Sequence, residues 1–178
     1  MQVDNGRYPD DYESYLYEFH ATRDYFECHE LLEDYWKANP GDGYGHAWVG
    51  LIQLAVGSYH HRRDNLHGAS KMYRQAFRRL EAGQLNELGI DGQELLSRID
   101  RRIAAAENGE TFADLMIPIV DEALLERLRA SAEANGIAWG APSSADQALV
   151  HRHMLRDRSD VIAARAAAAA QRSRPSSG

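Results

Sequence analysis

Residues 50–61 read Gly-Leu-Ile-Gln-Leu-Ala-Val-Gly-Ser-Tyr-His-His, and the centre of this stretch, residues 51–56, is apolar on nearly every side of a helix. Such a helix has hardly any face suited to water, so other helices must bury it on several sides. The preceding residues 39–43, Asn-Pro-Gly-Asp-Gly, are a dense cluster of helix breakers at which the chain turns. We therefore predict a buried helix over residues 44–63.

Helical periodicity continues on both sides of this segment, and no convincing alternating strand pattern is present. Further predicted helices cover residues 10–21, 22–38, 65–82, 92–107 and 121–134. Thr22 and Asn65 have side chains typical of N-caps and are expected to begin their helices. The fold class expected is all-α, a small irregular helical array or bundle with a helical C-terminal extension.

Two local features refine this picture. The inner stripe predicted for the helix after Asn65 consists of Leu66, Ala69, Met72, Tyr73, Ala76, Phe77 and Leu80. Residues 115–120 are apolar but broken by Pro118, and no element is assigned to them. The expected domains are a lead-in (1–13), a helical core (14–86), a helical extension packing on the core (87–155) and an Ala/Arg-rich helix fraying into a disordered tail (156–178).

The composition is that of a globular protein, with 178 residues, 44% of them hydrophobic and 26% charged. Since no apolar run is long enough for a bilayer and the N-terminus lacks a signal segment, we expect a cytoplasmic protein without membrane contact. One cysteine, Cys28, excludes an intramolecular disulfide. The net charge of −7 argues against nucleic-acid binding by the whole molecule and leaves only the arginines from Arg156 onward for such a contact.

The polar residues that could carry chemistry lie on two predicted helices. His29 and Glu33 are four apart and share a helix face, which is the spacing by which one helix offers two ligands to a metal. His46, Gln53 and His60 are each seven apart on the apolar helix, where buried polar groups need partners.

If the two helices form an antiparallel hairpin, His29 lies opposite Gln53, and His60 lies near residues 22–26. Hydrogen bonds between His29 and Gln53, and between His60 and a carboxylate, are the structural interpretation of the same pattern. A stagger of one turn would instead bring His60 toward His29. The neighbouring His61 points elsewhere and is interpreted as solvated.

A longer pattern joins these residues: Phe26-Glu27-Cys28-His29-Glu30, Leu32-Glu33, Trp36, Gly50 to Gly57, Tyr59-His60, Asn65 and Gly68-Ala69. Over about residues 14–82, this pattern resembles the bacterial and archaeal family called domain of unknown function 309. The resemblance implies a small all-helical array, and some catalogues label such proteins predicted metal-dependent hydrolases. It places His29, Glu30, Glu33, Gln53 and His60 at the characteristic polar positions of the family. Residues beyond about Glu87 fall outside it and are interpreted as a lineage-specific extension.

The first functional hypothesis is a metal-dependent hydrolase that acts on an unidentified small-molecule substrate. His29, Glu33 and His60 would hold zinc, manganese or iron, Glu30 would act as the general base, and Gln53 would provide polar support. The alternative is a non-enzymatic helical module that binds a partner, in which the His/Glu/Gln cluster is a structural polar network. Trp36, Asn65 and Gly68 are assigned structural roles in either case.

Overall fold

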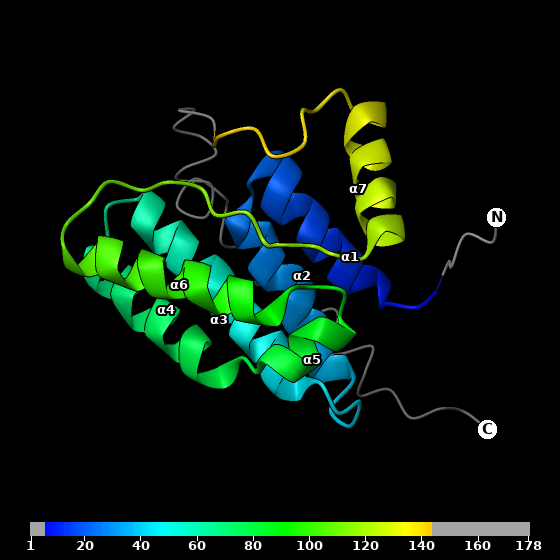
Figure 1. Ribbon diagram of the computed structural model, residues 1–178, viewed down its shortest axis with the longest axis horizontal. Coiled ribbons are helices and arrows are strands. Elements are labelled where there is room, and N and C mark those ends of the chain that lie inside the picture. The colour runs from blue at the N-terminus through cyan, green and yellow to red at the C-terminus, as the bar shows by residue number, and fades with distance from the viewer. Residues whose placement is uncertain (1–5, 144–178) are drawn as a thin grey trace, which may run out of the picture.

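The computed structural model describes residues 6–143, which form helices joined by short turns and one long extended segment (Figure 1). The helices are α1 (Asp10–Tyr17), α2 (Tyr25–Ala38), α3 (Gly45–Arg62), α4 (Leu66–Arg79), α5 (Ala82–Glu87), α6 (Gly92–Glu107) and α7 (Glu122–Ala134), with a π-helical turn, η1 (Glu18–Thr22), after α1. The all-α prediction is therefore confirmed. No helix within residues 6–143 is long and apolar enough to cross a membrane. The predicted tail helix over residues 156–178 lies outside the described residues.

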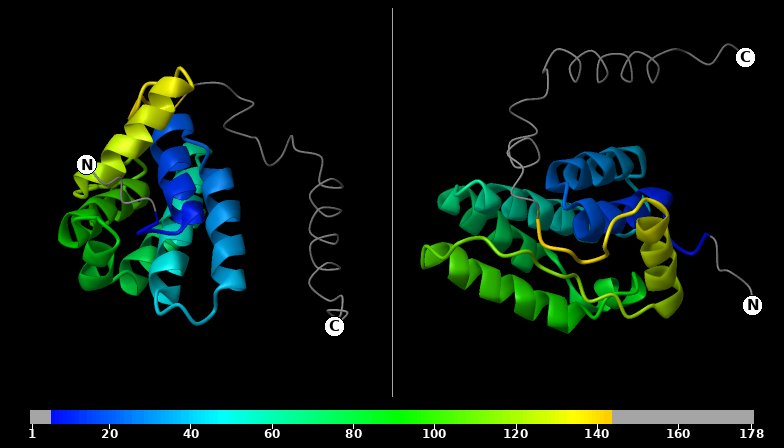
Figure 2. Two further views of the ribbon diagram at one scale, coloured as in Figure 1. Left: turned by 90° about the vertical axis from the view of Figure 1, so that its right-hand side faces the viewer. Right: turned by 90° about the horizontal axis from the view of Figure 1, so that it is seen from above.

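The helices α2, α3 and α4 pack in sequence order, α6 lies against α4, and α1 lies against α2 (Figure 2). α7 packs against α1 at one end of this row (Figure 1). The apolar centre of α3 is buried as predicted, with Trp48, Leu51 and Leu54 each at most 1% exposed. Burying a side chain of this size stabilises the fold by about 1.5–3 kcal/mol. α1 is also tied to α3 because the hydroxyl of Tyr15 donates to the carbonyl oxygen of Leu51 at 2.7 Å.

The start of α2 differs from the prediction. Asp24, not Thr22, is the N-cap, and its carboxylate accepts from the backbone N–H of Glu27 at 3.1 Å. Thr22 ends η1 instead, where its hydroxyl bonds back to Glu18. Between them, Arg23 has a left-handed backbone with φ of 57°. This residue breaks the helical path, so the cap moves two positions along the chain.

The helix predicted from Asn65 to Ala82 divides into α4 and α5. Asn65 is the N-cap of α4 as predicted, and its side chain accepts from the N–H of Gly68 at 3.0 Å. α4 ends at Arg79 because Leu80 turns into an extended conformation and packs over Gly50. A Cβ on Gly50 would lie 2.5 Å from Leu80 Cδ2, so this glycine makes room for the turn.

Gly92, the first residue of α6, permits a close approach of backbone to backbone. A Cβ at Gly92 would lie 2.4 Å from the carbonyl oxygen of Ala82, and backbone cannot step aside as a flexible side chain can. We expect Gly92→Ala to lower the free energy of unfolding by about 1–3 kcal/mol, measured by urea denaturation. Gly83→Ala is the matched control, because no atom lies within 4 Å of its Cβ position and alanine favours helix. Equal stability of the two variants would contradict the close approach.

The unassigned apolar residues 115–120 belong to an extended segment that returns along the bundle from α6 to α7 (Figure 1). Leu115 and Ile117 are buried within the core. Ile119 forms an isolated antiparallel bridge with Ile90, and the carbonyl oxygen of Pro118 accepts from the N–H of Asp91 at 2.9 Å. The patch is apolar because its side chains cover the core, and it does so in an extended conformation.

Candidate functional site

His29 and Glu33 lie on one face of α2, as their spacing predicts. His29 Nε2 is 2.6 Å from Glu33 Oε2, and the other carboxylate oxygen, Oε1, is 2.6 Å from Lys37 Nζ. His29 Nδ1 is 3.8 Å from Glu30 Oε1. Each oxygen of the Glu33 carboxylate therefore already faces a cationic or hydrogen-bonding side chain one helical turn away.

His60 lies at the end of α3 and contacts the start of α4. The amide of Asn65 is oriented by its cap, since Oδ1 accepts from Gly68 and Nδ2 faces His60 Nδ1 at 3.3 Å. An amide Nδ2 only donates, so His60 Nδ1 accepts and the neutral ring carries its proton on Nε2. Burial and the neighbouring Arg63 lower the pKa of His60, which favours this neutral form. In this arrangement, neither ring nitrogen of His60 offers a free lone pair.

Gly68 completes the same turn. A Cβ at Gly68 would lie 2.7 Å from Asn65 Nδ2 and 3.1 Å from His60 Cδ2. The glycine thus leaves room for the pair formed by His60 and Asn65. Trp36, the third residue assigned a structural role, lies near the end of α2 and is 37% exposed, with its indole nitrogen near Gly45.

Gln53 contacts α4 and not α2. Its Nε2 donates to Gln75 Oε1 at 3.1 Å, while its own Oε1 is buried without a hydrogen-bond partner. The side chain thus bridges α3 and α4, and the bond to His29 raised by the sequence pattern is absent from the described part of the chain.

The register between α2 and α3 explains why these residues stay apart. The rings of Tyr35 and Trp48 are 5.4 Å apart, and those of Phe26 and Tyr59 are 6.2 Å apart. His60 is therefore level with the start of α2, about 6 Å along the axis from His29. No group of three His, Cys, Asp or Glu side chains among residues 6–143 is placed to hold a metal ion. His29, Glu33 and His60 do not fit a common three-ligand site in this part of the chain.

A buried polar cluster that the sequence analysis missed is centred on Arg23. Its guanidinium donates to the carbonyl oxygens of Phe19 (3.1 Å), Leu115 (3.0 Å), Ala141 (3.0 Å) and Gly140 (3.2 Å). Arg23 Nε also lies 3.9 Å from Asp114, a carboxylate that accepts from the Tyr25 hydroxyl at 2.6 Å. Nothing in the sequence marks Arg23, since arginine is ordinarily a surface residue. The cluster fastens the extended segment and the loop after α7 to the helices.

Two buried histidines form hydrogen bonds to the backbone of the same extended segment. His20 Nδ1 lies 2.8 Å from the carbonyl oxygen of Leu16, and its Nε2 accepts from the N–H of Ile117 at 2.9 Å. Burial lowers the pKa of His20 to about 4, so the ring is neutral near pH 7. The interpretation of His61 as solvated is wrong, because it is 2% exposed and bonds Glu110 O at 2.9 Å. The return of the extended segment over α3 covers His61, and helix geometry alone does not reveal this.

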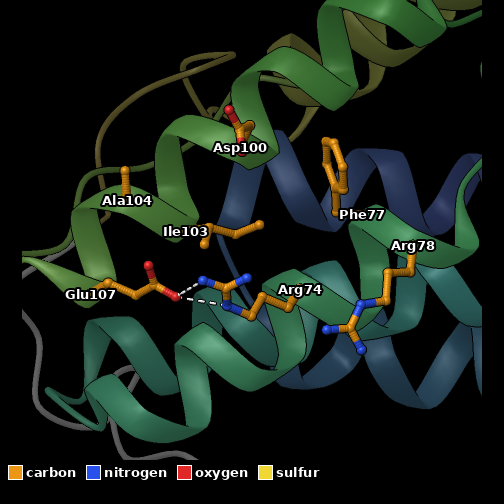
Figure 3. A pocket seen from close by; sticks show the side chains of 7 residues that line it. All are labelled: Arg74, Phe77, Arg78, Asp100, Ile103, Ala104 and Glu107. Atoms are coloured by element: carbon orange, nitrogen blue, oxygen red, sulfur yellow. Dashed lines mark hydrogen bonds and ion pairs between the residues drawn. The ribbon is translucent and has the colours of Figure 1, made fainter.

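A cavity of about 240 Å³ opens between α4 and α6 (Figure 3). Phe77 and Ile103 project toward the space between the helices, and the ion pair of Arg74 with Glu107 lies at one end (Figure 3). Phe77 is 40% exposed, so its predicted place on the inner stripe of α4 is wrong. Its neighbours on the stripe, Ala76 and Leu80, are buried as predicted, whereas the Phe77 ring lines the cavity.

A second cavity, of about 370 Å³, lies between α1 and α7. Its lining is mainly polar and includes Glu13 and Arg127, whose carboxylate and guanidinium are 3.2 Å apart. The lining also contains Glu18, so the cavity has two acidic side chains against one basic side chain.

Comparison with known proteins identifies relatives. The model of the family described as domain of unknown function (DUF309) matches residues 12–72. The chain is 44% identical over 158 residues to the uncharacterized protein YpuF of Bacillus subtilis (strain 168), a match that covers 87% of this chain and 91% of the relative. A match of this length extends beyond Glu87 and so includes part of the chain that the family model does not cover. No solved structure matches the chain.

Proposed function

The chain belongs to the family described as domain of unknown function 309, and from this premise we propose that it is a non-enzymatic helical binding module. In this proposal, the His/Glu/Gln cluster holds helices in register, and a partner binds elsewhere on the surface. The cavity between α4 and α6 supports the binding role.

One observation carries the proposal. His60 Nδ1 faces the amide nitrogen of Asn65 at 3.3 Å, and the oxygen of the same amide caps α4 through Gly68. This histidine therefore orients the residue that caps α4, and its acceptor nitrogen, Nδ1, is already in a hydrogen bond with Asn65. The bond between Gln53 and Gln75 joins the same two helices, which is what a structural polar network does.

The test is a double-mutant cycle on His60 and Asn65. We expect His60→Ala and Asn65→Ala each to lower the free energy of unfolding by about 1 kcal/mol. The loss of unfolding free energy in the double variant should be smaller than the sum of the two single losses, by about 0.5 kcal/mol or more, because the two side chains act as one unit. The measurement is urea denaturation with and without a chelator. Two results would contradict the structural role. One is a loss of stability in the double variant equal to the sum of the single losses, and the other is a set of losses that disappears when the chelator removes metal.

A metal-dependent hydrolase is the second candidate, favoured by the distance of 2.6 Å between His29 and Glu33 on one helix face. Zinc, manganese or iron would suit a histidine and a carboxylate. Elemental analysis of the dialysed full chain separates the two functions. The binding module predicts no stoichiometric transition metal, whereas the hydrolase predicts about one per chain, lost in His29→Ala while the helical circular dichroism persists.

A further inference from the structure

α4 presents a stripe of basic side chains to solvent. His67, Lys71, Arg74 and Arg78 follow one another at intervals of four, three and four residues, so they share one helix face, and Lys71, Arg74 and Arg78 carry its positive charge. All four are exposed, and residues 66–79 contain no Asp or Glu. The stripe is about 17 Å long. This local positive charge stands out on a chain whose net charge is −7.

The cavity beside this stripe has an apolar floor. Phe77 is 40% exposed, and Ile103 of α6 projects toward it (Figure 3). The volume of about 240 Å³ is below the range of about 300–1,000 Å³ typical of sites for small molecules. A cavity of this size suits one anchoring apolar side chain of a protein partner.

We propose that the face formed by α4 and α6 binds an acidic amphipathic helix of a partner protein, with one apolar side chain of that helix against Phe77. Acidic residues spaced by three or four positions match the spacing of Lys71, Arg74 and Arg78, and an apolar residue beside them reaches the cavity. The inference rests on the proposed binding function, because it names the surface and the class of partner.

Two features favour a protein over a nucleic acid. Asp100 lines the cavity next to the cationic stripe, and its carboxylate would repel phosphates drawn in by the arginines. An acidic helix carries its charge on one face only, so it can meet Lys71 and Arg78 while its remaining side chains face Asp100. Glu107 already forms an ion pair with Arg74, so Lys71 and Arg78 carry the main attraction.

The experiment uses the full chain and a designed helical peptide with glutamates spaced to match Lys71, Arg74 and Arg78 and one leucine beside them. Binding is measured by fluorescence anisotropy at low ionic strength. We expect the wild-type chain to bind this peptide and affinity to fall at least tenfold in Phe77→Ala and in the double variant Lys71→Glu/Arg78→Glu. Arg129→Glu, a charge reversal on an exposed residue of α7, is the matched control and should change affinity less than twofold.

A charge-swapped peptide, with lysine in place of each glutamate, is the control for misfolding of the double variant. It should bind the Lys71→Glu/Arg78→Glu variant more tightly than the wild-type chain, which a misfolded variant cannot do. Absent binding of the acidic peptide, or equal affinity in all variants, would overturn the inference. So would tighter binding of a single-stranded oligonucleotide that is lost in the same double variant. A metal found in the chain and lost in His29→Ala would overturn the proposed function and leave the peptide result standing.

Discussion

Replacing Arg23 by alanine should lower the free energy of unfolding by about 3–5 kcal/mol, the range found when one partner of a buried charged network is removed. The Arg23 side chain is 3% exposed, and its guanidinium bonds four backbone carbonyl oxygens. The bonds to Phe19 and Leu115 are buried, so their carbonyl oxygens would lose a donor out of reach of water, and the carboxylate of Asp114 would lose its neighbouring positive charge.

Urea denaturation followed by circular dichroism measures this loss, with two comparison variants. Arg129→Ala removes an exposed arginine and should change stability by less than about 0.5 kcal/mol. Arg23→Lys keeps the charge but lacks the planar fork that reaches several carbonyls at once, so it should recover less than half of the loss. If Arg23→Lys equalled the wild type, charge alone and not the carbonyl network would explain the effect.

Stability should also fall by up to about 3 kcal/mol as pH is lowered from about 6.5 to about 4, through His20 alone. The pKa of His20 is lowered to about 4 in the folded chain by burial, from an ordinary value near 6.5. Between these values, the unfolded chain binds a proton at this residue and the folded chain does not, so protonation favours unfolding. The contribution is fully present above pH 6.5 and is lost as pH falls toward 4.

The difference between wild type and His20→Gln isolates this contribution. Glutamine does not titrate, so the free energy of unfolding of this variant should vary less with pH between 6.5 and 4. The pKa of His60 is also lowered, so His60 contributes to the pH dependence of stability with the same sign. This contribution is present in both proteins and cancels in the difference between them. A direct titration of the His20 ring by nuclear magnetic resonance checks the result if the variant is too unstable. Identical pH profiles, or a ring that titrates near 6.5, would contradict the buried neutral histidine.

The helical core could be predicted because its signals are local. The apolar centre of α3 requires burial from several sides, and Asn65 caps α4 through a residue three positions later. The predicted helix ends were wrong where the direction of the chain depends on tertiary packing. Arg23 breaks the path between η1 and α2, and Leu80 ends α4 by turning over Gly50.

The candidate site could be predicted only within single helices. The closeness of His29 and Glu33 is a property of any helix, because residues four apart are neighbours on its surface. The partners of Gln53 and His60 depend on the register between α2 and α3 and on the position of α4. Since a hairpin register shifted by one turn satisfies the same apolar pattern, the sequence left these partners open.

By itself, the sequence determined the helices, most of their ends and the contacts within one turn, since these follow from the spacing and chemistry of neighbouring residues. Only the tertiary structure decided what the buried polar residues do. Arg23 bonds Leu115 and His20 bonds Ile117, across 92 and 97 positions of the chain. Such bonds exist because the segment after α6 returns over the helices, and that return is set by how the packed helices close the core.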